Sequence, residues 1–376
     1  MLVLKYIRSL LFDSPRWFFI LLICVLAVMR TGIWAIPNFR SYMALAQDPF
    51  SNTLVHDTYA HYMFYNWLGL FVTWFFEIKT IGSFFVFHFI FSVLFIILFF
   101  YVVFSRFSDE DARKACLLFF ACSVSMTSFF WVSYDCLLLF FMMLPLAFPR
   151  FLILVFLCGF AAGMEHFFQS VIAFSILFVV LAASRKELRS PDYSLVFCLV
   201  MIAGICLGRL VIQWVIYDYQ IDVNSGRVVW VFGRLSLTHL IQKALFNHLH
   251  LAVWTTLGVG WFIVLRYIDE GKKVIPCIIG LLFAVSFVIV TLDSTRVGAN
   301  LSLPLLSVFW FFSPYFLIRL RPVDLSLLFI LWLVVPWIYI MGDLRLASSF
   351  SYDVQFILNY FFGWFENTGD WVSLPK

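Results

Sequence analysis

Continuous apolar runs of about twenty residues recur along this chain, and they constrain its fold more than any other feature. A run of that length is what an α-helix needs to cross the hydrocarbon core of a bilayer. A transmembrane β-barrel would alternate apolar and polar residues within segments of about ten, and these runs do not alternate. Hydrophobic residues make up 64% of the 376, far above the share in soluble domains. The sequence therefore predicts an all-α polytopic membrane protein.

The runs predict about eleven transmembrane helices in one membrane domain that covers residues 1–376. They cover roughly 16–36, 81–105, 114–132, 134–149, 151–166, 168–184, 194–216, 249–267, 273–292, 301–319 and 323–342. Residues 57–78 are apolar but interrupted by polar residues, so we expect helices that lie at the membrane interface there. No small-residue cleavage site follows the first run, so no cleavable signal peptide is expected.

The Lys and Arg residues predict the orientation, because cytoplasmic connections retain positive charge. With a cytoplasmic N-terminus, 15 of the 25 Lys and Arg residues fall in short cytoplasmic segments. The longer segments, 37–80, 217–248 and the tail 343–376, then lie outside. The formal net charge of +4 reflects this bias and does not indicate a nucleic-acid partner.

Ionisable side chains gather on the predicted outer side. Six of the seven histidines fall on or next to that face, and the predicted cytoplasmic loops contain none. In the segment HDTYAH, Asp57 and His61 are four residues apart, so a helix would place them on one face with Tyr65. A carboxylate beside an imidazole suits a general base and its orienting partner, and the neighbouring His56 is a candidate for binding substrate. The alternative is an interfacial helix with ordinary residues of the aromatic belt.

Two further acidic positions lie at predicted outer ends of spans. Asp135 opens a span in WVSYDCLLL, where a carboxylate at the edge of the hydrocarbon is costly unless it is paired or faces a cavity. We expect it to line the site, and the alternative is a helix N-cap. Glu165 and His166 occupy a tight connection between two spans and, being adjacent, cannot share a helix face. One of the two is expected to point into a cavity while the other caps or orients.

Basic residues on the same side are candidates for binding a phosphate. In TLDSTRVGAN, Arg296 follows Asp293 and precedes a helix expected to start after Asn300. A guanidinium suits bidentate phosphate recognition, and a helix start adds backbone donors. Asp293 would hold Arg296 in place, and the alternative is a simple surface ion pair. Arg209, inside a span, and Arg234 are the substitutes.

The cysteine and histidine patterns do not predict a metal centre. Most of the eight cysteines lie inside apolar runs without a CxxC spacing, as buried small hydrophobic residues do. The His and Asp residues show no fixed-spacing zinc motif such as HExxH. No cofactor is therefore predicted, and a requirement for a divalent cation is left open.

Together these features resemble the GT-C class of membrane glycosyltransferases. That class combines many spans and a non-cytoplasmic active site with a long first outer loop that carries interfacial helices and an acidic residue. Here the loop is 37–80, and Asp48 or Asp57 matches the acid, with Asp57 preferred for its neighbours. The pair Tyr134–Asp135 and the EHFFQ turn look like motifs of bacterial members. No pair of adjacent acids, as in the mannosyl-transferring members, appears in the loop.

The resemblance implies transfer of a sugar from a polyprenyl-phosphate-linked donor to a glycan or lipid-linked acceptor, with inversion at the anomeric carbon. Asp57 would deprotonate the acceptor hydroxyl, and a fixed cation would stabilise the departing phosphate, with Arg296 as first choice. The implied partners are the lipid-linked sugar, the acceptor and membrane lipid. The implied location is a bacterial inner membrane, with the active site facing the periplasm or exterior.

Other functions stay open. A polysaccharide polymerase of the O-antigen type shares the topology and the outward site but uses a lipid-linked oligosaccharide as donor. A membrane acyltransferase would need a buried histidine within a span, and His88 is the candidate. A transporter would carry acidic residues deep inside its spans, whereas the acids within the predicted spans here lie near the ends of those spans, mainly the outer ends. A non-catalytic assembly partner is a further alternative.

Overall fold

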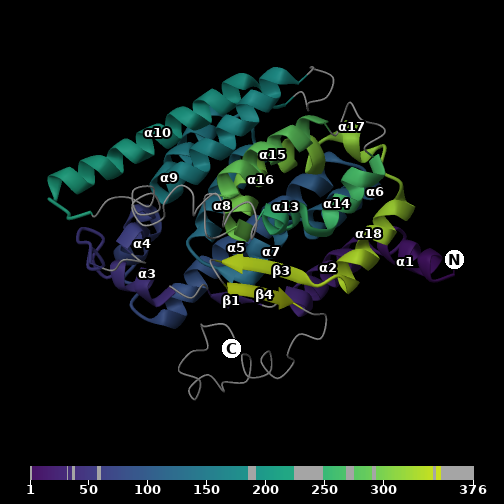
Figure 1. The fold of residues 1–376 in the computed structure, drawn as a ribbon, viewed down its shortest axis with the longest axis horizontal. Coiled ribbons are helices and arrows are strands. Elements are labelled where there is room, and N and C mark those ends of the chain that lie inside the picture. Colours follow the sequence, from purple (N-terminus) through teal and green to yellow (C-terminus); the bar gives the residue numbers. More distant parts are fainter. Residues whose placement is uncertain are drawn as a thin grey trace, which may run out of the picture.

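A computed structural model shows a mostly helical bundle (Figure 1). It describes residues 2–31, 33–35, 39–56, 61–184, 192–223, 249–267, 275–289, 294–341 and 344–348. Within these ranges, four helical segments are long and apolar enough to cross a membrane: Ile81–Arg106 (α5), Leu152–Ala183 (α9), Leu195–Asp218 (α10) and Leu249–Tyr267. The count becomes five if α1 and α2, which meet at an angle of 114°, form one broken span. The expectation of a helical membrane protein is thus met, while the number of about eleven spans stays a prediction.

Shorter elements complete the bundle. The first half of the chain contributes α1 (Leu2–Phe12), α2 (Arg16–Thr31), α3 (Phe39–Leu45), the 3₁₀ turn η1 (His61–Tyr65), α4 (Trp67–Phe75), α6 (Asp109–Ala121), α7 (Ser123–Phe130) and α8 (Asp135–Ala147). The second half contributes α13 (Leu249–Leu257), η4 (Gly258–Gly260), α14 (Trp261–Tyr267), α15 (Ile275–Ile289), α16 (Ser294–Leu306), the π-helical turn η6 (Ser307–Phe311), α17 (Pro314–Leu317) and α18 (Pro322–Val334).

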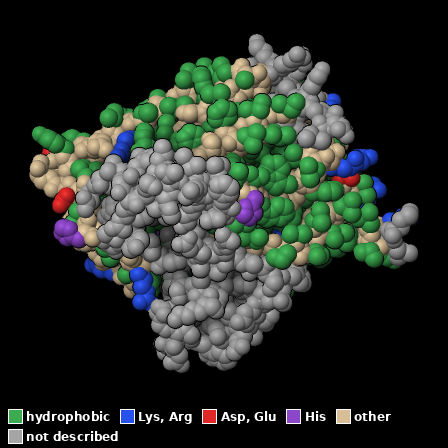
Figure 2. All heavy atoms as spheres, viewed as in Figure 1, with side chains coloured by type: hydrophobic (Ala, Val, Ile, Leu, Met, Phe, Trp, Pro, Cys, Tyr) green, Lys and Arg blue, Asp and Glu red, His purple; other side chains and the backbone are tan. Residues whose placement is uncertain are grey.

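Helix α5 exposes a stripe of large apolar side chains. The stripe consists of Val86, Ile90, Val93, Ile97 and Tyr101, all of them at least 40% exposed. Spacings of three and four residues place them on one face of the helix. Such a face is expected against lipid rather than water. Figure 2 shows hydrophobic side chains over much of the described surface, with charged side chains mainly towards the left and right edges of the view.

Four predicted helix boundaries are wrong. The span expected at 16–36 ends at Thr31, and residues 34 and 35 form a short strand. The span expected at 114–132 is two helices that meet at Cys122, where Ser125 Oγ donates to the carbonyls of Phe120 and Cys122 and helps to end α6. The span expected at 323–342 ends at Val334, because Pro336 disfavours helical geometry in the residue before it. The fourth error, the start of α16, changes the candidate site and is described in the next subsection.

Two small sheets tie distant segments together. Strand β1 (Trp34–Ala35) pairs in parallel with β2 (Trp131–Val132), so the end of α2 lies beside the start of α8. Strand β3 (Trp337–Met341) pairs antiparallel with β4 (Leu344–Ser348), in the lower part of Figure 1. The predicted tail 343–376 therefore begins with a strand, and its remaining residues lie outside the described part.

Helix α9 reverses direction at His166, whose φ of −155° and ψ of 81° are not helical. Ser170 Oγ donates to the carbonyl oxygen of Ala162 at 3.1 Å, although eight residues of straight helix would separate the two by about 12 Å. The ring of Phe174 also lies 6.1 Å from that of Phe197, near the beginning of α10. The chain after His166 thus runs back beside the half before it, as a tight connection between two predicted spans requires. The 32 residues of α9, counted above by length and composition, are therefore two antiparallel halves and not one straight span.

The first half of α9 packs directly on the backbone of α10 (Figure 1). A Cβ on Gly159 or Gly163 would collide with the carbonyl of Met201 or Ile205, and one on Gly208 would collide with the carbonyl of Phe160. Each helix carries two glycines four residues apart, which is the small-residue pattern that lets membrane helices approach closely.

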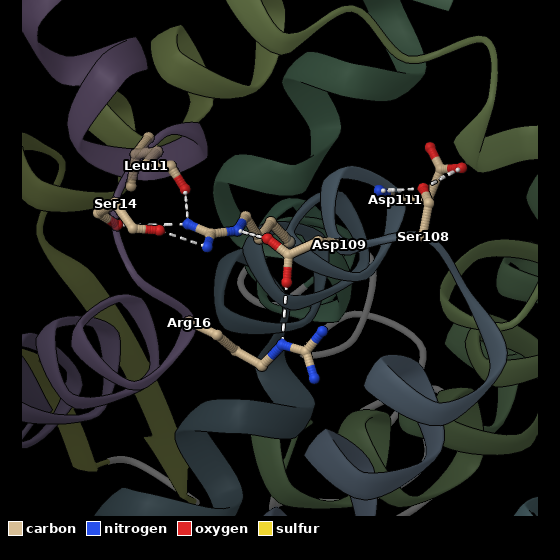
Figure 3. Close-up of polar contacts among 7 residues, drawn as sticks. Leu11, Ser14, Arg16, Ser108, Asp109 and Asp111 are labelled. Carbon is tan, nitrogen blue, oxygen red and sulfur yellow. Dashed lines mark hydrogen bonds and ion pairs between the residues drawn. The ribbon is translucent and has the colours of Figure 1, made fainter.

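Charged side chains form a network around Asp109, and we call this part of the bundle the Asp109 end. Figure 3 shows the contacts of Arg16 and Asp109 in this network. Asp109 accepts hydrogen bonds from Arg16 at 2.9 Å and from Arg113 at 2.6 Å, and Arg113 also donates to the carbonyls of Leu11 and Ser14. Arg106, three residues before Asp109, donates to the carbonyl oxygen of Ala147, the last residue of α8. Asp135 begins the same helix twelve residues earlier, about 18 Å away, and so lies towards the opposite end. The two ends of the bundle therefore differ in chemistry.

Candidate functional site

Arg296 and Asp135 form a buried ion pair at the Asp135 end. The guanidinium Nη1 lies 2.7 Å from Asp135 Oδ2, and the two side chains are 3% and 1% exposed. The sequence-based expectation of a helix start after Asn300 is wrong, because α16 begins at Ser294 and places Arg296 in its first turn. The alternative of a surface ion pair for Arg296 is also wrong, since the side chain is buried.

Asp135 has more than one polar neighbour. Asn300 Nδ2 donates to Asp135 Oδ1 at 2.9 Å and to Gln169 Oε1 at 2.6 Å, and Ser133 Oγ donates to Asp135 Oδ2 at 3.2 Å. We call these five residues the Asp135 cluster: Ser133, Asp135, Gln169, Arg296 and Asn300. The N-cap of α8 is Tyr134, so the alternative of Asp135 as an N-cap is wrong. The cluster joins α8, α9 and α16 through side chains that are all buried.

Glu165 forms a second buried group with the first loop. Its Oε2 accepts a hydrogen bond from the backbone N–H of Gly69, in α4, at 2.8 Å, and its Oε1 lies 3.5 Å from the Tyr42 hydroxyl. Burial and the neighbouring Glu165 carboxylate raise the pKa of Tyr42 well above its usual value, so the phenol stays protonated and acts as a donor. We call Tyr42, Gly69 and Glu165 the Glu165 cluster.

Aromatic rings connect the two clusters. The Tyr42 and Tyr134 ring centroids are 4.9 Å apart, and the Arg296 guanidinium carbon lies 4.9 Å from the centroid of the Tyr134 ring. Tyr134 is therefore placed between the first loop and the ion pair. A guanidinium over a desolvated ring gains cation–π attraction, which helps to fix the position of Arg296.

Arg209 lies where α10 meets the first loop. Its guanidinium carbon is 4.4 Å from the centroid of the Tyr65 ring in η1 and 5.8 Å from that of Phe167. The amide of Gln213, in the orientation that satisfies both groups, accepts from Arg209 Nη2 at 2.9 Å. The side chain is half-buried, and no carboxylate of a described residue pairs with it. Arg209 is thus a cation held in place without a neutralising partner in the described part of the chain.

Several predicted site residues are placed only in part. Asp57, Arg234 and Asp293 lie outside the described residues. The backbone of His61 begins η1, and its side chain is outside the described part. His56 is exposed.

Asp48 and His166, also singled out from the sequence, lie within the described residues. Asp48 is exposed, and its Oδ1 accepts from the backbone N–H of Phe50 at 3.1 Å, as in a loop turn. His166 is half-buried at the reversal of α9, directly after the fully buried Glu165. Glu165 therefore faces the protein interior while the backbone at His166 makes the turn.

His88, the candidate for an acyltransferase base, is fully buried in α5. Its Nδ1 lies 2.8 Å from the carbonyl oxygen of Phe84, and rings of Phe39 and Tyr42 pack within 6 Å of it. A ring nitrogen bonded to a backbone carbonyl fixes one neutral tautomer. The aromatic surroundings of His88 are those of a packed core residue.

The described residues contain no group of three or more His, Cys, Asp and Glu side chains arranged to hold a metal ion. What the two clusters offer instead is hydrogen bonding and fixed charge. Asn300 Oδ1 has no hydrogen-bond partner among the described residues, so the Asp135 cluster retains one unused acceptor.

Some members of these clusters had no individual sequence signal. Gln169, Asn300 and Tyr42 are polar residues in or beside apolar runs, and polarity within a predicted span is the signal that could have drawn attention to the first two. Tyr42 could not have been singled out, because tyrosines are common at membrane interfaces.

Searches of protein-family models, of curated proteins and of solved structures found no match to this chain.

Proposed function

We propose that this protein is a membrane glycosyltransferase that transfers a sugar from a polyprenyl-phosphate-linked donor to a glycan or lipid-linked acceptor. The observation that supports this function is the convergence of ionisable side chains from the first loop, α8, α9, α10 and α16 at one end of the bundle. Charged groups at such positions are expensive, and they are retained mainly where they act on a substrate or ion.

The proposed chemistry is an in-line displacement. The acceptor hydroxyl attacks the anomeric carbon, a new carbon–oxygen bond forms, and the bond from that carbon to the phosphate oxygen breaks. The electron pair leaves with the polyprenyl phosphate, and the carboxylate of Asp57 takes the hydroxyl proton. The sugar is transferred with inversion at the anomeric carbon. The reaction as written requires no metal ion.

The cation that stabilises the departing phosphate is Arg209 in this proposal. Asp135 already neutralises Arg296 within the protein interior, whereas the charge of Arg209 is compensated by no carboxylate among the described residues. Arg209 also lies against Tyr65, in the turn that follows the segment carrying Asp57. A fixed guanidinium there would face charge that develops on the leaving group. Arg296 would act indirectly, by holding Asp135 and Tyr134.

The predicted orientation completes the proposal. About eleven spans with a cytoplasmic N-terminus would put the Asp109 end inside and the Asp135 end outside, in a bacterial inner membrane. A transporter finds less support, because the break in α9 is a reversal between two helix halves and not an unwound point in mid-span.

The role of Arg209 is tested in proteoliposomes by donor affinity and turnover of Arg209→Ala and Arg209→Lys. The alanine variant should lose both, and the lysine variant should be clearly impaired because it lacks the planar fork. Arg150→Ala, at an exposed ion pair with Asp192, is the matched control and should behave as the wild type. Normal donor binding and turnover in Arg209→Ala would remove the phosphate role from this residue.

A further inference from the structure

Arg30 lies in the last turn of α2 and is 1% exposed. Its guanidinium carbon lies 5.3 Å from the centroid of the Trp332 ring and 5.4 Å from that of Trp337. Its Nη2 donates to the carbonyl oxygen of Val335, the residue that caps the C-terminal end of α18. The side chain is thus enclosed by two indoles and a helix end.

Two buried donors in this group have no acceptor in the described part of the chain. Arg30 Nη1 and Trp337 Nε1 make no hydrogen bond to any described residue, and Trp337 is 4% exposed. No carboxylate of a described residue pairs with Arg30 either. A buried cation without a counter-charge and a buried N–H without an acceptor are both costly. An anion that accepts hydrogen bonds would stabilise both the charge and the donors.

The surrounding protein meets only part of this demand. The C-terminal ends of α2 and α18 carry partial negative charge, and the indole faces attract a cation. These effects lower the cost of the charge, but no described residue accepts a hydrogen bond from either donor. A buried water would accept from the donors and leave the positive charge uncompensated.

The backbone is shaped to admit the Trp337 indole. Gly258 has a φ of +55°, a conformation that residues with a side chain rarely adopt. A Cβ at this position would lie 3.1 Å from two ring carbons of Trp337. Glycine at 258 therefore lets the indole lie against the η4 turn.

We propose that Arg30 and the Trp337 indole N–H bind the phosphate group of a membrane lipid. A phosphate supplies the missing negative charge and several acceptor oxygens, and a guanidinium matches its geometry. The depth also suits a lipid, since Arg30 lies one residue before the end of α2 and near the outer end of the span predicted at 16–36, where lipid phosphates are expected. The proposal does not depend on glycosyl transfer.

This site is separate from the Asp135 cluster but adjoins it. Strand β1, four residues after Arg30, pairs with β2, which leads into α8. On the other side, the backbone N–H of Ile340 in β3 donates to Thr295 Oγ1 at 3.0 Å, next to Arg296. A phosphate at Arg30 would therefore be bound near β1 and β3, the two strands through which this site adjoins the Asp135 cluster.

The test is the shift in melting temperature of the purified full-length protein on addition of lipid, since a ligand that binds only the folded state raises it. The probes are farnesyl phosphate against farnesol, phosphatidylglycerol against diacylglycerol, and inorganic phosphate alone. Farnesyl phosphate or phosphatidylglycerol should raise the melting temperature, and farnesol and diacylglycerol should not. Which of the two phosphorylated lipids acts identifies a monoester or a diester ligand.

The variants locate the site. Both variants are made in the Arg209→Ala background, so that the phosphate site of the proposed function does not contribute. Arg30→Gln should then abolish the shift, while Arg16→Gln, at the other end of the same helix and 54% exposed, should keep it. Trp337→Phe retains the ring but removes the donor, and should weaken lipid affinity about tenfold even if Arg30→Gln fails to fold. Wild-type affinity in Trp337→Phe, an undiminished shift in Arg30→Gln, or no shift with either phosphorylated lipid would overturn the proposal. An equal effect of inorganic phosphate would show a free-anion site rather than a lipid site.

Discussion

At the scale of single residues, the ion pair between Arg296 and Asp135 has the most to lose from a substitution. Both groups are out of water, and each is stable there because the other neutralises it. Asn300 and Ser133 donate further hydrogen bonds to the same carboxylate, which offsets more of its desolvation. Removing one member leaves the other as an uncompensated buried charge. That charge costs more free energy than the lost attraction of an exposed pair.

Arg296→Ala should therefore destabilise the protein by about 3–5 kcal/mol, against at most about 1 kcal/mol for an exposed pair. Asp135→Asn combined with Arg296→Gln should recover part of that loss, because no isolated charge remains. Unfolding in detergent by denaturant measures both free energies. A loss near that of an exposed pair for Arg296→Ala would contradict the buried pair.

At the scale of elements, the close approach of α9 and α10 fixes where several functional residues lie. Gly163 lies two residues before Glu165, and Gly208 is adjacent to Arg209. Backbones in contact leave no freedom for the helices to slide, so Glu165 and Arg209 meet the first loop at a defined register. The glycines thus serve the site without touching it.

Gly163→Ala and Gly208→Ala should each cost about 1–3 kcal/mol, because the added methyl group collides with a carbonyl of the facing helix. Gly82→Ala is the matched control, since a Cβ there meets no atom within 4 Å. It should be neutral or stabilise α5 by about 0.5–1 kcal/mol. Equal effects at all three positions, measured by thermal unfolding, would show that the helix contact is not responsible.

At the scale of the whole molecule, charge separates the two ends of the bundle. Arg16, Asp109 and Arg113 form an ion-pair network at one end, and the Asp135 and Glu165 clusters lie at the other. The first contains the basic connections that predict the cytoplasmic side.

Single cysteines in a cysteine-free background check this orientation. Position 48, in the exposed turn of the first loop, should react with a membrane-impermeant reagent in intact cells, and position 150 should react only after permeabilisation. The opposite pattern would place the Asp135 end in the cytoplasm and remove the basis for an outward active site.

The sequence predicted the helical membrane class and the long helices α5 and α10, because continuous hydrophobicity determines them directly. It did not predict the Asp135 cluster, since Asp135 and Asn300 are 165 positions apart and only tertiary packing brings them together. The start of α16 was missed because Ser294, Thr295 and Arg296 read as a polar loop. Arg30 was overlooked as the end of an ordinary span, although a lone arginine within an apolar run is itself a signal.

The proposed function requires that this protein cleave a polyprenyl-phosphate-linked sugar at a site served by Asp57. The most direct measurement is release of polyprenyl phosphate from a panel of such donors in proteoliposomes with acceptor lipid, comparing wild type with Asp57→Asn. The proposal predicts release by the wild type and a fall of about 10²–10⁴-fold in the variant, which keeps its size but loses the proton acceptor. No release from any donor, or equal rates for the two proteins, would contradict it.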